Sequence, residues 1–120
     1  MELPKIFESE YRFCQILWAL EPVNSTELVK VCREKLGWKK STTYTVIKRL
    51  SERGVVKLEN ACVTSLISQE QIQHSESRTF VDRIFGGSLP QFIAAFAGEK
   101  RLTRQEAEAL RQMIDQYEEE

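Results

Sequence analysis

The spacing of apolar residues changes from a helical to a strand period at Gly54. The segment before it, starting at Ser41, has a narrow apolar face at helical spacing: Val46, Ile47 and Leu50. Two short runs of apolar and β-branched residues come directly after it, at positions 55–58 and 62–67, and they predict a β-hairpin. A short helix that leads straight into a hairpin is compatible with few folds.

Two further helices are predicted ahead of this segment. The first covers about residues 8–20 and ends there because Pro22 disfavours helix at the residue before it. The second starts in a capping sequence and covers residues 24–37, ending at a glycine. Three helices followed by a hairpin is the order of a winged helix-turn-helix domain, which we predict over residues 1–68.

Three more helices are predicted in residues 69–120, separated by Gly86-Gly87 and by a capping box that begins at Thr103. The fold class is therefore mainly α with a small β-hairpin, a winged helix-turn-helix domain followed by C-terminal dimerisation helices. Each of these helices has too few apolar residues for an independent core, so we expect a partner chain to cover them. The predicted dimerisation residues are Phe80, Ile84, Phe85, Leu89, Phe92, Ile93, Phe96, Leu110 and Ile114.

Positive charge is concentrated in one part of a chain whose formal net charge is only −1. Residues 30–57 contain nine Lys and Arg against two Glu, which gives this segment a formal charge of +7. In a helix-turn-helix the second helix of the motif lies in the DNA major groove, with its first residues at base edges. Basic and hydroxyl side chains on and ahead of that helix suit phosphates and bases. The predicted contacts with double-stranded DNA are Lys39, Lys40, Ser41, Thr42, Thr43, Thr45, Lys48 and Arg49.

A second copy of the chain is expected on energetic grounds as well. One recognition helix buries little surface, whereas specific sites must be bound roughly 10³–10⁷ times more tightly than non-specific DNA. A two-fold axis doubles the contacts and matches a palindromic operator. We therefore expect a homodimer, with affinity that depends on both recognition helices being held together.

The composition argues against other classes of protein. The chain has one histidine and three widely spaced cysteines, so no metal site and no cofactor are predicted. No nucleophile elbow or glycine-rich phosphate loop is present, and an enzyme is not expected. No apolar run is long enough to cross a membrane and the first residues do not resemble a signal peptide, so we expect a cytoplasmic protein without membrane insertion.

Each feature of the basic helix also has a simpler explanation. Ser41 can be a helix cap, Lys39 and Lys40 can belong to a solvated loop, and Tyr44 can be a packing residue as readily as a DNA contact. A winged-helix module that binds another protein instead of DNA is the alternative hypothesis. It is the combination on one helix, between a helical pair and a hairpin, that favours DNA.

Three stretches of the sequence resemble the BlaI/MecI/CopY family of penicillinase-type repressors. They are ESEYRFCQILWAL, STELVKVCREKLGWKKSTTYTVIKRLSERGVV and FVDRIFGGSLPQFIAAFAGEKRLTRQEAEALRQMID, which together cover nearly the whole chain. The pattern from Trp38 to Leu50 and the GGSL sequence at 86–89 are the most specific parts. The resemblance implies a homodimeric repressor with an N-terminal winged helix and intertwined C-terminal helices.

The resemblance also implies a way to release the repressor. In the β-lactam-responsive branch, a membrane-bound metalloprotease sensor triggers cleavage in the dimerisation region, and the matching bond here joins Ala95 and Phe96. Familiar members have asparagine or a similar polar residue where this chain has Ala95. The cysteine cluster of the copper-responsive branch is missing from the last residues, DQYEEE. The hairpin turn carries no basic residue, so little phosphate contact is expected from it.

Overall fold

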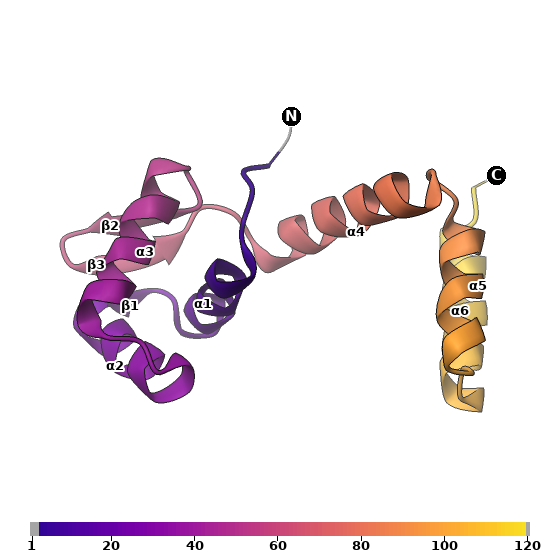
Figure 1. The fold of residues 1–120 in the computed structure, drawn as a ribbon, viewed down its shortest axis with the longest axis horizontal. Helices are drawn as coiled ribbons and strands as arrows, with labels where there is room; N and C mark the ends of the chain where they lie inside the picture. Colours follow the sequence, from indigo (N-terminus) through magenta and orange to yellow (C-terminus); the bar gives the residue numbers. More distant parts are fainter. Residues whose placement is uncertain (1–2, 120) are drawn as a thin grey trace. The chain divides into compact units, whose positions relative to one another are not determined.

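A computed structural model describes residues 3–119 of the chain (Figure 1). Its elements in order are α1 (Glu8–Leu20), β1 (Val23–Asn24), α2 (Ser25–Leu36), α3 (Lys40–Glu52), β2 (Val56–Glu59), β3 (Cys62–Ser65), α4 (Gln69–Phe85), α5 (Leu89–Glu99) and α6 (Arg104–Tyr117). They form two compact units, the first ending at Glu76 and the second beginning at Ser77. The mainly α class with a small hairpin and the winged-helix order are confirmed.

The start of α2 follows its capping signal in the sequence, whereas the start of α3 does not. The Asn24 side chain accepts a 2.8 Å hydrogen bond from the Thr26 N–H at the start of α2. At the start of α3, however, the cap position is Lys39 and no side chain caps the helix. The prediction that α3 begins with Ser41 as its cap is therefore wrong, because Ser41 already lies within the first turn.

The sheet has three antiparallel strands in the order β1-β3-β2. The hairpin pairs Val56 with Ser65, and β1 pairs Val23 with Val63 on the other side of β3. The two-residue strand β1 was not predicted because two residues cannot show an alternating pattern. It places the start of α2 beside the hairpin.

A tight turn joins β2 to β3. Asn60 and Ala61 both have positive φ, at 53° and 62°, the backbone that a two-residue hairpin turn requires. Asparagine tolerates this region well, whereas alanine adopts it at a cost of roughly 1–2 kcal/mol. The surroundings of the turn therefore have to hold it in place.

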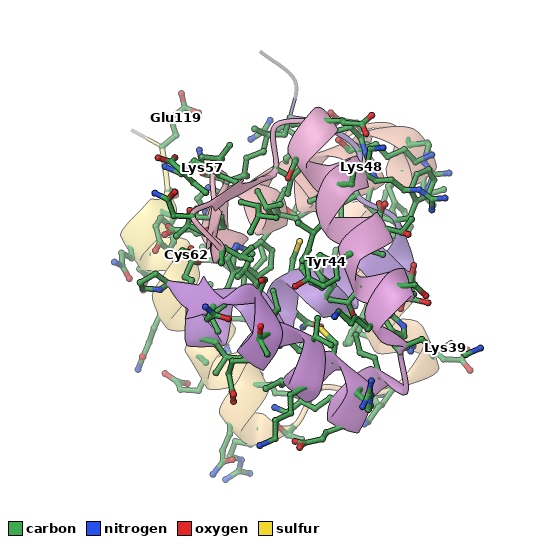
Figure 2. All side chains as sticks on the ribbon, turned by 90° about the vertical axis from the view of Figure 1, so that its left-hand side faces the viewer. Lys39, Tyr44, Lys48, Lys57, Cys62 and Glu119 are labelled. Carbon is green, nitrogen blue, oxygen red and sulfur yellow. The ribbon has the colours of Figure 1, made fainter. Side chains whose placement is uncertain are left out.

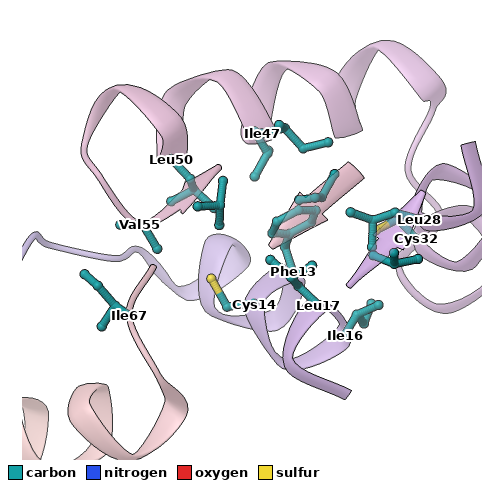
Figure 3. Packing of buried hydrophobic residues seen from close by; sticks show 14 of the residues in the cluster. Phe13, Cys14, Ile16, Leu17, Leu28, Cys32, Ile47, Leu50, Val55 and Ile67 are labelled. Carbon is teal, nitrogen blue, oxygen red and sulfur yellow. The ribbon is translucent and has the colours of Figure 1, made fainter. Parts of the chain in front are cut away.

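The core of the first unit is built around α1. Phe13 and Leu17 are fully buried and pack with residues from α2, α3 and the sheet. Figure 3 shows the Phe13 ring beneath α3, with Ile47 above it and Leu28 beside it. The Trp38 ring stacks on Phe13 with centroids 6.1 Å apart. Removal of this apolar surface from water stabilises the packing of α3 on the domain.

The second unit begins inside α4, later than the sequence suggested. Residues 69–120 were expected to separate at the start of this helix, but Ile72 is 2% exposed and belongs to the first unit's core. The first turns of α4 therefore fold with the winged-helix domain. The sequence did not reveal this because Ile72 is an isolated apolar residue in a polar stretch.

Helix ends in the second unit follow the predicted signals. Gly86 and Gly87 have positive φ and end α4, after which the Ser88 side chain caps α5 by accepting from the Gln91 N–H at 3.2 Å. Thr103 caps α6 in a reciprocal capping box with Glu106, with distances of 2.9 and 3.0 Å. Within residues 3–119, no helix is long and apolar enough to cross a membrane.

An ion pair joins α1 to the end of α3. Glu10 is almost fully buried, and one of its carboxylate oxygens accepts a hydrogen bond from the Arg53 guanidinium. The other accepts from the Phe7 N–H at 2.9 Å, and Arg53 also donates to the Lys5 carbonyl at 2.6 Å. Burial alone raises the pKa of Glu10, but the hydrogen bonds from Arg53 and Phe7 outweigh it and leave the pKa below its usual value.

Removal of this carboxylate is expected to destabilise the domain. We expect Glu10→Ala to lower the free energy of unfolding by about 2 kcal/mol at pH 7, because it leaves Arg53 without its charged partner. Since the pKa of Glu10 is lower folded than unfolded, its contribution is full above pH 4.5 and is lost as the pH falls through the folded value. Urea denaturation at several pH values measures this difference.

A matched control is Glu8→Ala, in the same helix. Glu8 is 85% exposed and pairs with Arg12 at 3.8 Å, so the loss should be close to zero at any pH. An equal loss for both variants, or a Glu10→Ala effect that does not shrink in acid, would contradict the assignment.

Candidate nucleic-acid interface

The third helix has an inner face and an outer face. Its inner face is buried: Thr43, Val46, Ile47 and Leu50. The outer face contains the exposed residues Ser41, Thr42, Thr45, Lys48 and Arg49. Figure 2 shows Lys39 and Lys48 near opposite ends of α3, with Tyr44 between them. A single helix thus presents hydroxyls near its start and cations at both ends.

The structure removes one residue from the predicted interface. Thr43 is 0% exposed, and its hydroxyl lies 3.5 Å from the Lys39 carbonyl, within its own helix. Its side chain packs toward the core and cannot reach a ligand on the outer face. The helical spacing held the signal, because Thr43 precedes Val46, Ile47 and Leu50 by three, four and seven residues and so lies on their face.

Four cations are exposed at this surface. Within the described residues, no ion pair forms at Lys39, Lys40, Lys48 or Arg49. Arg53, one turn further on, is instead bound to Glu10. The charge of Arg49 acts on Glu10 and helps to lower the pKa of that carboxyl, whereas Lys39, Lys40 and Lys48 are available to an external anion without first breaking an ion pair.

The start of α3 adds a further attraction for anions. No side chain caps it and its first turn holds no acidic residue, so the N–H groups there remain open. The turn that leads into it depends on Gly37, whose φ is +70° and whose N–H bonds to the Arg33 carbonyl at 3.1 Å. Phosphate binding at such a helix start is a common arrangement.

The sequence allowed Tyr44 to be either a packing residue or a DNA contact, and the structure shows which contact it makes. Its hydroxyl donates a 3.0 Å hydrogen bond to the Ser25 hydroxyl at the start of α2. Tyr44 is therefore engaged with the neighbouring helix. Ser25, which is 5% exposed, was not among the predicted site residues, and no signal in its own stretch of sequence pointed to it.

The hairpin carries little net charge. Lys57 on β2 lies 3.5 Å from the Glu59 carboxylate, and both side chains are more than half exposed. The next residues in the turn are Asn60 and Ala61. This agrees with the expectation of a wing that contributes few phosphate contacts.

Two of the three cysteines in the first unit are buried. Burial raises the pKa of Cys14 to about 12 and that of Cys32 to about 11, so both thiols stay protonated. Among residues 3–119, no group of three His, Cys, Asp or Glu side chains is arranged to hold a metal ion. The interface on α3 is the chemically distinctive surface of the first unit.

The predicted dimerisation residues fall into two groups. Phe80, Phe85, Phe92 and Phe96 form one aromatic cluster within the chain, with neighbouring ring centroids 5.6–6.2 Å apart. The other residues face outward or line a shallow apolar groove. Ile84, Leu89 and Ile114 are 50–62% exposed, and Ile93 and Leu110 line the groove between α5 and α6. No residue of α5 or α6, both fully described, is buried.

Comparisons with known proteins agree with this arrangement. A family model described as penicillinase repressor matches residues 6–116. The methicillin resistance regulatory protein MecI of Staphylococcus aureus is 23% identical over 92% of this chain and 94% of its own length. The penicillinase repressor of Bacillus licheniformis is 21% identical over 97% of this chain and 94% of its own length.

A solved structure shows the same fold. It is the solution structure of Bacillus licheniformis BlaI in its monomeric form, in complex with the blaP half-operator. It superposes with a TM-score of 0.51 at 22% identity and covers 58% of this chain and 90% of that one. The winged helix-turn-helix architecture of the first unit is therefore shared.

The fold and the surface of α3 define a winged-helix protein of the transcriptional repressor class. The family model matches residues 6–116 and so spans both compact units, which identifies the family as well as the class. This chain belongs to the penicillinase repressor family.

Proposed function

We propose that this chain is a homodimeric repressor that places α3 in the major groove of a palindromic DNA operator. The observation that carries the proposal is the exposed surface on and just ahead of α3, where four cations that form no ion pair within the described residues accompany Ser41, Thr42 and Thr45. Short hydroxyl side chains allow close approach to base edges, and the cations neutralise phosphates on either side. The BlaI domain with this fold binds a half-operator, which supports the same role here.

A homodimer is proposed from the second unit. Several of its large apolar residues are exposed, among them Leu89 at 58% and Ile114 at 62%, and burial against another chain would remove them from water. An identical chain offers the same surface in return, which is the requirement of a two-fold interface. The two recognition helices would then bind adjacent half-sites.

Release is proposed to follow from loss of the dimer. Ala95 and Phe96 lie in the middle of α5 and are both exposed, so a sensor-triggered protease could reach this bond once α5 opens locally. Cutting or loosening α5 would separate the two recognition helices and remove the avidity of the pair. The repressor itself performs no chemistry in this scheme.

The test is a fluorescence anisotropy titration against two labelled duplexes, one from the chain's own upstream region and one scrambled, at several salt concentrations. We expect preference for the upstream duplex and a steep loss of affinity with salt, by roughly 0.9 in log affinity per log salt for each phosphate neutralised. Equal, weak binding to both duplexes would contradict specific recognition. No binding at low salt would favour the protein-interaction module instead.

The wing provides a smaller prediction of the same proposal. We expect Lys57→Ala to change affinity for the upstream duplex by less than about twofold and to leave the salt slope nearly unchanged, because Glu59 already neutralises this lysine. The same titration measures both quantities. A fall of about one in the salt slope would show that the wing contacts a phosphate after all.

A further inference from the structure

The inference concerns Ser25, the first residue of α2. We propose that Ser25 is a positioning residue, which fixes the rotation of α3 relative to the hairpin through a hydrogen bond from Tyr44. The inference rests on the proposed function, since it concerns how α3 is aimed at DNA. Neither residue belongs to the exposed face that would touch DNA.

Ser25 makes two hydrogen bonds in opposite directions. Its backbone N–H donates to the Ala61 carbonyl in the hairpin turn at 2.8 Å, and its hydroxyl accepts from the Tyr44 hydroxyl at 3.0 Å. The residue before it, Asn24, pairs with Cys62 in the sheet. Ser25 is therefore attached to the hairpin on one side and to the middle of α3 on the other.

The location of Tyr44 makes this bond relevant to recognition. Tyr44 immediately precedes Thr45 on the outer face and lies one turn before Lys48. A hydrogen bond from Tyr44 to Ser25 holds one side of α3 against α2, and it thereby influences the direction in which Thr45 and Lys48 point. Figure 2 shows Tyr44 at the middle of α3, between the two labelled lysines of the interface.

Apolar packing limits this rotation to a range without selecting a single value. Leu28 on α2 and Ile47 on α3 belong to one buried cluster, and such contacts set the distance between helices but are non-directional. A hydrogen bond, by contrast, weakens steeply when its angle departs from the favourable range. The bond from Tyr44 to Ser25 therefore favours one rotation among those that the packing tolerates.

Through Ser25, the hydrogen bond from Tyr44 also links α3 to the strained hairpin turn. Ala61 has a φ of 62° without being glycine, and its carbonyl is the group held by the Ser25 N–H. The turn, the start of α2 and the middle of α3 form one continuous set of contacts. The hairpin therefore has a structural role that requires no contact with DNA: its Ala61 carbonyl holds Ser25, which in turn orients α3.

The experiment compares full-length Tyr44→Phe, Ser25→Ala and the double variant with the unmodified chain. Each is titrated against the upstream and scrambled duplexes, well below its melting temperature. We expect Tyr44→Phe to reduce the preference for the upstream duplex by about three- to tenfold, the range of one lost hydrogen bond. Affinity for the scrambled duplex should stay within about twofold, because every cation remains.

The remaining variants separate positioning from general destabilisation. Ser25→Ala should give the same loss, and the double variant no more than either single change, because both remove one bond. The matched controls Tyr11→Phe and Thr26→Ala, each of which loses a hydroxyl elsewhere in the unit, should keep the full preference. Circular dichroism melting confirms that every variant is folded at the assay temperature.

Three results would overturn the inference. One is an unchanged preference in Tyr44→Phe, even with a lower melting temperature, since that is what a purely structural bond predicts. Another is a double variant whose loss equals the product of the two single losses. If the unmodified chain itself shows no preference between the duplexes, the proposed function fails, and this inference is withdrawn with it.

Discussion

Reversing two charges on α3 is expected to abolish specific DNA binding. In the variant Lys48→Glu/Arg49→Glu, we expect affinity for the upstream duplex to fall by a factor of about 10² or more, because each lost contact costs about 1–3 kcal/mol. Both side chains are exposed and make no ion pair within the described residues. Because Arg49 also lowers the pKa of the buried Glu10, circular dichroism melting is used to confirm that the variant is folded. Anisotropy measures the affinity, and the salt slope should become shallower.

A matched control changes the net charge equally on another surface. Arg12 and Lys35 line an open groove formed by α1 and α2, so Arg12→Glu/Lys35→Glu alters overall attraction to DNA without altering α3. We expect at most a few-fold loss from this variant. If both double variants lose affinity equally, the effect is one of net charge, and α3 is not the recognition element.

Charged residues on the outward apolar surface of the second unit are expected to separate the dimer. We expect the variant Leu89→Asp/Ile114→Asp to sediment as a 14.0 kDa monomer. Its affinity for the palindromic site should fall by a factor of about 10² or more, since the second half-site no longer binds as part of one molecule. Leu89 and Ile114 are 58% and 62% exposed, so each chain should still fold.

The control for this variant is Gln91→Asp/Gln112→Asp, which adds the same charge to the same two helices at exposed polar positions. It should remain dimeric and bind normally. Analytical ultracentrifugation reports the assembly state, and anisotropy reports the affinity. A monomer that retains tight operator binding would contradict the dimer proposal, as would an unmodified chain that sediments as a monomer at micromolar concentration.

Much of the fold could be predicted from the sequence because its signals are local. Gly37 and Gly86-Gly87 end their helices where their positive φ values are needed. Apolar spacing located Val46, Ile47 and Leu50 on the inner face of α3, where they are buried. Signals of this kind depend only on neighbours within a turn or two.

The features that sequence reasoning missed depend on contacts between distant parts of the chain. The strand β1 exists only because Val23 lies beside Val63, and Ile72 joins a core formed by much earlier residues. No local pattern reveals these two contacts. Thr43 is a different case: it was placed in the interface because of its hydroxyl, although its spacing from Val46, Ile47 and Leu50 already puts it on the buried face.

The contacts that support the candidate site from within the domain were also missed. The pairs Glu10–Arg53 and Ser25–Tyr44 join residues on different helices and orient α3 from behind its exposed face. The exposed residues that would contact DNA could be proposed from composition, because Lys, Arg, Ser and Thr side chains are the types that bind phosphates and bases. The supporting contacts could not, because a buried glutamate or serine has no distinctive sequence surroundings.

The central claim is that α3 contacts the operator. The most direct measurement is a two-dimensional amide NMR titration of the labelled full-length chain with the upstream duplex. We predict that the largest changes fall on amides of residues 39–49, with smaller changes at the hairpin and none specific to the groove formed by α1 and α2. Changes centred on that groove, with the α3 amides unaffected, would contradict the account.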